Sequence, residues 1–350
     1  MKVAAVIDHK VTIINQAMPV PKEPLVVIRV VYAGACTEYK GYINNEQFTY
    51  PYRGVISGDC CSLGHEAVGY IEESHSEGYE VGDRVVVQPL LSCGKCRFCQ
   101  SGDYIFCPHG FSYEDVIGSS IGTGSYAQYL LKPSWLLTGI PDDIDFKYAM
   151  MALCGFGPAY GAYQRMLKAG NGYTLVVGCG PVGLGAIILG KHYGENVIAI
   201  AKHEYRGEIA KSVGADIVFM TGEADIESKV KEVVIDSSGG PGYILECSGS
   251  ESGRALALAC AGIQTEIALI GQGGSIEAVV TPQINLKGIS IHGIWHYNLK
   301  GYEHLMQIMR ENRSEIDEMV THILPMSQVE RAWELQSSKQ CGKVLIDPWS

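Results

Sequence analysis

The loop that decides the fold of this chain reads Cys93-Gly94-Lys95-Cys96-Arg97-Phe98-Cys99, and Cys107 closes it eight residues later. Four thiols at this spacing can surround one tetrahedral metal ion, and an all-cysteine shell is typical of structural zinc. A ferredoxin-type iron–sulfur cluster starts with the same spacing, but its fourth cysteine follows after three residues. Disulfides and unligated core cysteines are the other interpretations. Zinc is favoured because core cysteines would not gather in one polar, glycine-containing loop.

Length and composition predict a two-domain globular protein. The chain has 350 residues, 47% hydrophobic and 19% charged, which is too many for one ordinary core. A net charge of −11 without a basic run argues against nucleic acid or an anionic membrane as partner. The N-terminal apolar run is broken by Asp8, and no apolar stretch could span a bilayer. With twelve cysteines, we expect a cytoplasmic protein whose thiols bind metal or lie buried.

The pattern of elements changes near residue 150. Before it, short runs bounded by turn residues predict an all-β, barrel-like domain with strands at Val3–Ile7, Leu25–Tyr32, Ala67–Glu72 and Arg84–Val87. After it, a helix is expected from Tyr148 to about residue 168, and strands then alternate with helices, which predicts a parallel sheet. The predicted strands are Tyr173–Val177, Asn196–Ala201, Ile217–Met220, Tyr243–Glu246, Thr265–Gly271 and Ile289–His292. The tail, with helices at Tyr302–Glu311 and Gln328–Gln336 and a strand at Lys343–Ile346, is long enough to return to the first domain.

The turn after the first of these parallel strands reads Gly178-Cys179-Gly180-Pro181-Val182-Gly183 and opens a helix. In this context Gly178 permits a tight turn, Gly180 lets the backbone approach a pyrophosphate, and Gly183 lets the helix pack close to the strand. The first helical residues, Pro181 and Val182, bring free N–H groups and partial positive charge to the phosphates. A dinucleotide site is therefore predicted, with a plain glycine-rich turn as the alternative.

The end of the second parallel strand bears on the choice of dinucleotide. NAD-binding proteins place an acid there for the ribose hydroxyls, whereas this chain reads Ala201-Lys202-His203, with Arg206 close by. Three groups that are or can be cationic would suit a 2′-phosphate, so NADP is favoured over NAD. Glu204 keeps NAD as the alternative, because a shift of register would restore an acid.

These features resemble the zinc-containing medium-chain alcohol dehydrogenases over essentially the whole chain. The matching segments, in the family's order and at its separations, are Gly34–Glu38, Gly64–Gly69, Val81–Val85, the four-cysteine loop, Gly124–Tyr129, Cys154–Gly155, the glycine turn and Gly342–Val344. The resemblance implies a GroES-like β-barrel catalytic domain over residues 1–153 and 294–350, which carries the cysteine lobe at 93–107. It implies a Rossmann domain, a doubly wound parallel sheet, over residues 154–293.

The resemblance also implies the site residues and two zinc ions per chain. Cys36, His65 and Cys154 look like ligands of a catalytic zinc, and Glu66 like the acid that can approach it. The structural zinc would be held by Cys93, Cys96, Cys99 and Cys107. Further dinucleotide contacts are expected from Ser248, Gly271 and Lys343, besides the glycine turn and residues 201–206.

The chain departs from the family beside its first predicted ligand. The family reads Cys, any residue, Ser or Thr, then Asp, with His two residues later. Here Thr37 follows Cys36 directly, Glu38 replaces Asp, and Lys40 stands near the His position, which indicates a one-residue deletion. Thr37 is the predicted hydroxyl that passes the substrate proton, with Tyr39, Lys40 or water as alternatives.

The predicted function is hydride transfer between a nicotinamide cofactor and a small alcohol or carbonyl substrate: a secondary alcohol, polyol, cyclitol or aldehyde. A zinc with three protein ligands keeps an open position, where an alcohol would lose its proton and a carbonyl would be polarised. The alternatives are a zinc-free NADPH reductase of alkenes or quinones and a non-catalytic dinucleotide- and metal-binding protein. The substrate pocket is expected from the loop after Cys36, residues 48–55, Phe156, Trp295 and Tyr297. A homodimer or homotetramer that pairs through an edge strand, Thr265–Gly271 or Ile289–Gly293, is also expected.

Overall fold

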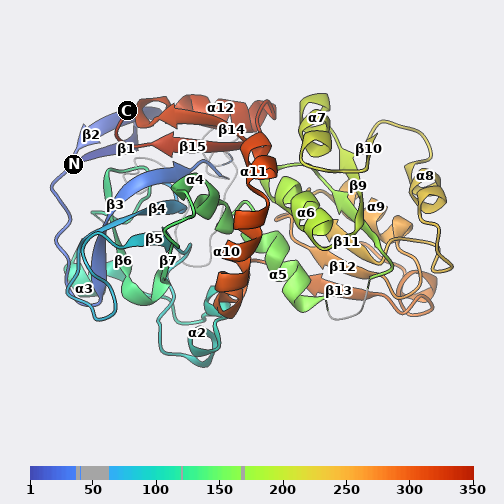
Figure 1. The fold of residues 1–350 in the computed structure, drawn as a ribbon, viewed down its shortest axis with the longest axis horizontal. Coiled ribbons are helices and arrows are strands. Elements are labelled where there is room, and N and C mark those ends of the chain that lie inside the picture. The colour runs from blue at the N-terminus through green and yellow to red at the C-terminus, as the bar shows by residue number, and fades with distance from the viewer. Residues whose placement is uncertain (37–39, 41–62, 120, 167–169) are drawn as a thin grey trace. The chain divides into compact units, whose positions relative to one another are not determined.

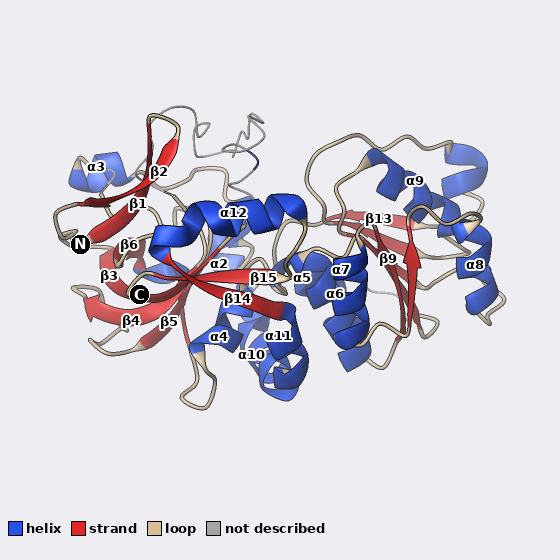
Figure 2. Cartoon of the chain, turned by 90° about the horizontal axis from the view of Figure 1, so that it is seen from above, coloured by secondary structure: helices blue, strands red, loops and turns tan. Residues whose placement is uncertain are grey.

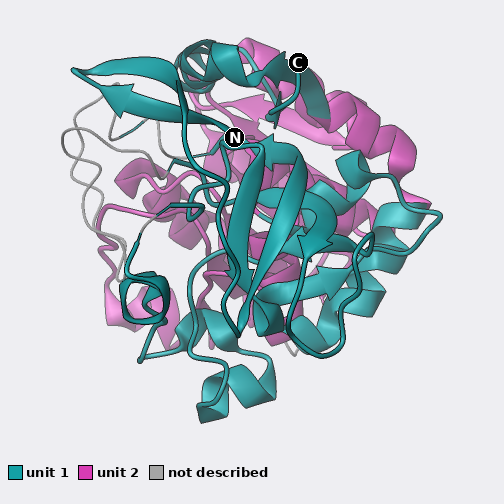
Figure 3. Ribbon diagram, turned by 90° about the vertical axis from the view of Figure 1, so that its left-hand side faces the viewer, with its two compact units in different colours: residues 1–153, 298–310, 320–350 teal, residues 154–297, 311–319 magenta. Residues whose placement is uncertain are grey.

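The computed structural model describes residues 1–36, 40, 63–119, 121–166 and 170–350. The chain divides into two compact units: residues 1–153, 298–310 and 320–350 form the first, and residues 154–297 and 311–319 the second (Figure 3). Among the described residues, none of the helices combines the length and apolarity that crossing a membrane requires.

The first unit is built on a seven-stranded, mainly antiparallel sheet (Figure 1). Its strands run in the order β14 (Val320–Pro325), β15 (Lys343–Asp347), β3 (Leu25–Gly34), β4 (Ala67–Glu73), β5 (Arg84–Val87) and β7 (Leu137–Gly139), and β6 (Tyr129–Pro133) pairs with β3. A separate hairpin joins β1 (Lys2–Ile7) to β2 (Lys10–Asn15). The apolar run of β3 is buried on both faces along most of its length, which makes this strand the centre of the unit.

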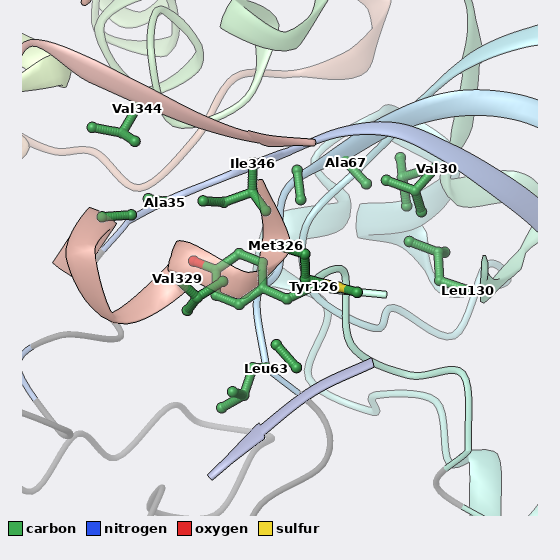
Figure 4. Packing of buried hydrophobic residues seen from close by; sticks show 14 of the residues in the cluster. Val30, Ala35, Leu63, Ala67, Tyr126, Leu130, Met326, Val329, Val344 and Ile346 are labelled. Atoms are coloured by element: carbon green, nitrogen blue, oxygen red, sulfur yellow. The ribbon is translucent and has the colours of Figure 1, made fainter. Parts of the chain in front are cut away.

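The helices of this unit are short apart from two near the C-terminus. They are α2 (Arg97–Ser101), α3 (Tyr113–Ile117), α4 (Phe146–Ala149), α10 (Tyr302–Glu311) and α12 (Val329–Ser338), with 3₁₀ turns at Tyr104–Phe106, Ser134–Leu136, Met150–Ala152, Leu299–Gly301 and Met326–Gln328. Helix α12 lies along β14 and β15 (Figure 2). Its Val329 and Trp333 are fully buried in the core cluster that also holds Tyr126, Leu63 and Ala35 (Figure 4). The C-terminal residues thus complete the core around the end of β3.

The second unit is a six-stranded, all-parallel sheet. Its order is β10 (Ile217–Met220), β9 (Asn196–Ala201), β8 (Tyr173–Val177), β11 (Tyr243–Glu246), β12 (Glu266–Leu269) and β13 (Ser290–Gly293). Its helices are α5 (Gly157–Arg165), α6 (Pro181–His192), α7 (Glu204–Ser212), α8 (Ile226–Val233), α9 (Glu251–Cys260) and α11 (Arg313–Met319), with a π-helical segment at Val280–Ile284. Helices α6 and α7 lie on one face of the sheet and α8 and α9 on the other (Figure 2). The strand order reverses between β8 and β11, which is where such sheets bind ligands.

The predicted strands of both units are present, with ends that shift by up to two residues. The helix expected from Tyr148 to about residue 168 is wrong in one respect: it breaks at residues 153–156, between a 3₁₀ turn and α5. Leu153 leaves the helical region with ψ −130°, and α5 restarts with a proline in its first turn. Because proline cannot donate to the preceding turn, the sequence at this point favours two helices over one. The break is where Cys154 lies.

Two segments of the C-terminal region belong to the second unit. The predicted domain bounds place residues 294–350 in one domain, whereas residues 294–297 and 311–319 cluster with the parallel sheet. Helix α11 packs against α6 and α7, and it buries Ile316 and Met319 completely. Asn312 Nδ2 lies 3.3 Å from His192 Nδ1, at the end of α6.

Candidate metal centres and dinucleotide site

The four cysteines of the 93–107 loop form a compact group of donors. The Sγ–Sγ distances are 3.5 Å for Cys96 with Cys99, 3.8 Å for Cys96 with Cys107, and 3.9 Å for Cys93 with Cys99. A tetrahedral ion with metal–sulfur bonds of about 2.3 Å has sulfur–sulfur edges of about 3.8 Å. The donor set therefore fits a closed zinc shell.

Local structure around the loop sets these positions. Cys96 and Cys99 flank the start of α2, and Cys107 follows the 3₁₀ turn at Tyr104–Phe106. Gly94 takes a φ of +74°, and a Cβ atom there would lie 2.6 Å from the ring of Trp135, so this turn needs glycine. Burial raises the pKa of the Cys107 thiol, but backbone N–H groups, that of Cys93 among them, outweigh burial and lower it. A thiolate is the form that binds metal.

A second group of donors joins residues far apart in the sequence. The donor atoms of Cys36, His65, Glu66 and Cys154 all lie within 4.8 Å of one another. Cys36 comes two residues after β3, and His65 and Glu66 immediately precede β4, which pairs with β3. Cys154, in the break before α5, follows directly on Leu153 of the first unit. Two thiols, one imidazole and one carboxylate are donors that suit zinc.

Glu66 is held by a cation from the end of the chain. Lys343 Nζ lies 2.7 Å from Oε1 and 2.8 Å from Oε2 of Glu66, and both side chains are fully buried. Burial raises the pKa of Glu66 to about 7, with Lys343 opposing the rise. The structure thus pairs Lys343 with Glu66, and its predicted contact with a dinucleotide stays a prediction.

The peptide that leads to Cys36 is held by Lys343 and by two side chains that the sequence analysis did not single out, those of Gln336 and Tyr126. The Ala35 carbonyl accepts hydrogen bonds from Gln336 Nε2 at 3.1 Å and from Lys343 Nζ at 3.3 Å. The Gly34 carbonyl accepts one from the Tyr126 hydroxyl at 3.2 Å. A buried glutamine on an otherwise apolar helix face was the available signal, because such a side chain needs a partner.

Of the residues predicted for the proton relay and the substrate pocket, several are outside the described residues and two are buried in the core. Thr37, Glu38, Tyr39 and residues 48–55 lie outside the described residues, so the proton relay and part of the predicted pocket stay predictions. Phe156 and Tyr297 are fully buried. The Tyr297 ring packs edge-on against Tyr160 at 5.9 Å, as a core residue does.

The glycine turn has the geometry that a dinucleotide turn requires. Gly178 takes a φ of +97°, and Gly180 caps α6. A Cβ atom on Gly183 would lie 1.8 Å from the Gly178 carbonyl oxygen, whereas one on Gly180 would meet only Arg206 Nη1, at 3.6 Å. The backbone at Gly180 is therefore open on the side where a phosphate would approach.

The end of β9 shows which side chains stand near this turn. The strand ends at Ala201, which is fully buried, and Lys202 after it is exposed. His203 caps α7, and Glu204 is the first residue of that helix. The register between β9 and β10 pairs Ala201 with Met220, so the end of the strand is an alanine and not an acid.

The loops after β11 and β12 also reach this edge of the sheet. A Cβ atom on Gly178 would lie 2.8 Å from Ser248 Cα, and one on Gly271 would lie 2.1 Å from the Gly249 nitrogen. The structure thus brings Ser248 and Gly271, two of the predicted dinucleotide contacts, to the glycine turn.

Alanine at two of these glycines should have opposite effects. Gly183→Ala should destabilise the second unit by several kcal/mol, since its Cβ would overlap a backbone oxygen. Gly180→Ala should leave stability within about 1 kcal/mol of wild type, because its Cβ has room, yet weaken dinucleotide binding by crowding the pyrophosphate. Thermal unfolding and cofactor titration of both variants check this. Equal stability of the two variants would contradict it.

Comparison with known proteins agrees with this geometry. The family model "Alcohol dehydrogenase GroES-like domain" matches residues 22–142, and "Zinc-binding dehydrogenase" matches residues 181–311. L-threonine 3-dehydrogenase of Bacillus subtilis is 30% identical over 295 residues, 82% of this chain and 81% of that protein. Sorbitol dehydrogenase of Halalkalibacterium halodurans is 29% identical over 346 residues, 94% of this chain and 93% of that protein.

Solved structures share the whole fold. Alcohol dehydrogenase TADH from Thermus sp. ATN1 superposes with a TM-score of 0.84 at 24% identity, covering 99% of each chain. An Escherichia coli CFT073 alcohol dehydrogenase (rspB), solved with NADH, gives 0.81 at 26% identity, again over 99% of each. The predicted fold class, a GroES-like domain with a Rossmann domain, is confirmed. The chain therefore belongs to the zinc-dependent medium-chain alcohol dehydrogenase family and is an oxidoreductase that acts on alcohols.

Proposed function

We propose that this chain is a dehydrogenase of secondary alcohols or polyols that binds two zinc ions and prefers NADP. The observation that carries the proposal is the convergence of Cys36, His65 and Cys154 on one point. Threonine, sorbitol and 2R,3R-butanediol are the alcohols named for relatives and structural neighbours, and each has a secondary hydroxyl group.

The donor set suits the chemistry. When bound, zinc supplies a Lewis acid with an open position that polarises the carbon–oxygen bond of the substrate. Two thiolates and a neutral imidazole balance the charge of the ion, so the site tolerates an oxygen that gains negative charge. Lys343 holds both oxygens of Glu66, which keeps that carboxylate from adding a further charge to the site.

The four-cysteine loop has a structural role in this proposal. Four thiolates complete a tetrahedral shell and leave no position for substrate. Its ion would fix a loop whose elements, α2 and a 3₁₀ turn, are too short to be stable by themselves.

The preference for NADP is proposed from the end of β9. With Ala201 in place of an acid and Lys202 and Arg206 beyond it, a 2′-phosphate meets positive charge. Arg206→Ala is expected to lower the ratio of kcat/KM for NADPH to that for NADH by about tenfold, the loss of one charge-assisted contact. The matched control is Lys211→Ala, in the last turn of the same helix, which should leave the ratio unchanged. A ratio that favours NADH in the wild type would contradict the preference.

The test of the activity combines two measurements. Metal analysis should find two zinc ions per chain. NADPH absorbance should fall when ketones derived from secondary alcohols and polyols are added, and zinc chelation should abolish this loss. If NADPH is still oxidised after the catalytic zinc has been removed, the chain would act as a zinc-free reductase instead.

The proposal also covers how subunits pair and where the protein is located. Since β12 is an interior strand and β13 an edge strand, pairing between subunits is proposed at β13, where Ile291 is 38% exposed. A cytoplasmic location is proposed because none of the cysteines in the described residues forms a disulfide.

A further inference from the structure

We infer that a buried ion pair, Glu246 with Arg254, fixes the two loops that hold the nicotinamide half of the dinucleotide. The inference rests on the proposed function, because it takes the carboxyl edge of the parallel sheet as the dinucleotide site. Both residues are positioning residues, which act through the backbone of the loops after β11 and β12.

Glu246 closes the loop that follows its own strand. It is the last residue of β11 and is fully buried. Its Oε1 atom accepts hydrogen bonds from the backbone N–H groups of Ser248, at 2.8 Å, and Gly249, at 3.1 Å, and another from the Ser248 hydroxyl. Hydrogen bonds that a charged carboxylate accepts from backbone N–H groups are stronger than those between neutral groups.

Arg254 links Glu246 to the loop that follows β12. Its Nε atom lies 3.6 Å from Glu246 Oε2, and its side chain is 7% exposed. Its Nη2 atom donates to the Gly271 carbonyl at 2.9 Å, and Nη1 donates to the Ser275 carbonyl at 3.1 Å. The rigid planar guanidinium presents its donors in a fixed fork, so it can face a carboxylate and two carbonyls that lie in different directions. One ion pair therefore holds both loops.

The loops after β11 and β12 pack closely against each other and against the glycine turn. The backbone of Gly271 touches that of Gly249, and Ser248 touches Gly178, so closely that a Cβ atom at either glycine would overlap its neighbour. A loop that moved at Ser248 or Gly271 would consequently change the surface presented at the glycine turn.

The position of the pair decides which half of the cofactor it affects. A dinucleotide binds across the point where strand order reverses, here between β8 and β11. The half made by β8, β9 and β10 carries the glycine turn and the ribose-binding strand end. Glu246 and Arg254 belong to the other half, next to β11 and β12, which would meet the nicotinamide nucleotide.

The test compares a whole dinucleotide with its adenosine half in Glu246→Gln. Glutamine keeps an oxygen for the two backbone N–H groups but loses the charge that faces Arg254. We expect NADPH to bind about tenfold to a hundredfold more weakly by calorimetry, while adenosine 2′,5′-bisphosphate binds as it does to wild type. For a wild type that prefers NADH, the pair of ligands is NADH and 5′-AMP. Zinc content should stay at the wild-type value.

A second variant covers the case in which Glu246→Gln does not fold. Arg254→Lys keeps the charge and reaches fewer partners, so it should weaken dinucleotide binding in the same selective way, by a smaller factor. Asp216→Asn is the matched control. Asp216 accepts from the Val197 N–H at 2.7 Å and pairs with Lys191 at 2.8 Å, at the opposite edge of the same sheet, so both ligands should bind normally.

Selective loss of the dinucleotide in either folded variant supports the inference. Equal loss of both ligands, or no loss, overturns it, because a general weakening of the unit would not distinguish the two halves. A wild type that binds neither dinucleotide overturns the proposed function instead.

Discussion

Cys154→Ala should bind one zinc ion per chain in place of two and lose about a thousandfold or more in kcat/KM. The variant leaves one thiol and one imidazole in the converging donor group, because Lys343 engages both oxygens of Glu66. Two ligands are too few to retain zinc at a site that also needs an open position. The Lewis-acid contribution is several kcal/mol, which corresponds to about three orders of magnitude in rate. Zinc per chain by elemental analysis, together with steady-state kinetics, measures both effects.

The same substitution at Cys260 is the control for Cys154→Ala. Cys260 is fully buried and belongs to neither donor group. Cys260→Ala should cost stability by leaving a cavity, yet keep both ions and the activity. Full activity in Cys154→Ala with a single bound ion would defeat the assignment of this cysteine.

Lys343→Met should cost about 3 to 5 kcal/mol of unfolding free energy, since it leaves the fully buried Glu66 carboxylate without its partner. The effect is large because both side chains have no exposed surface. The double variant Lys343→Met/Glu66→Gln should recover most of the loss, because it removes both charges together. Urea unfolding of the zinc-loaded single and double variants measures the difference.

A solvent-exposed ion pair in the first unit serves as the control for the stability loss in Lys343→Met. Arg331 and Glu334 lie 3.0 Å apart with side chains 58% and 55% exposed. Arg331→Met should change stability by less than about 1 kcal/mol, as solvent screens such pairs. A loss of similar size in Lys343→Met would show that Glu66 is neutral or reaches solvent.

The sequence predicted the parts of the fold that local pattern determines. Apolar runs such as Tyr173–Val177 and Asn196–Ala201 were correct to the residue, because strands buried on both faces are continuous in sequence. Four strands were missed: β2, β6, β7 and β14. Strand β6 contains a lysine and a proline, β7 has three residues, and β2 and β14 are half-buried or exposed along their length. Helix α11 was missed because only two of its residues, Ile316 and Met319, are buried.

The candidate site also has parts that local sequence pattern predicts and parts that it does not. The spacing within the 93–107 loop and the glycine turn indicated their functions, since each is one continuous segment. The predicted ligands Cys36, His65 and Cys154 came only through resemblance to a family, because sequence spacing does not indicate which distant residues the fold brings together. The partners of Ala35 and of Glu246 could not be predicted, as they depend on which buried polar groups the fold brings together.

Gln336 and Lys343 donate hydrogen bonds to the Ala35 carbonyl, and this has a consequence for the order in which the two metal sites form during synthesis. The 93–107 lobe is complete in one short segment and can capture its ion while the rest of the chain is still being made. The peptide before Cys36 obtains these two hydrogen bonds only when Gln336 and Lys343 have left the exit tunnel. If the chain binds two zinc ions as proposed, loading of the catalytic ion should follow synthesis of Gln336 and Lys343, and a nonsense codon before position 336 should leave a polypeptide that binds only the structural ion.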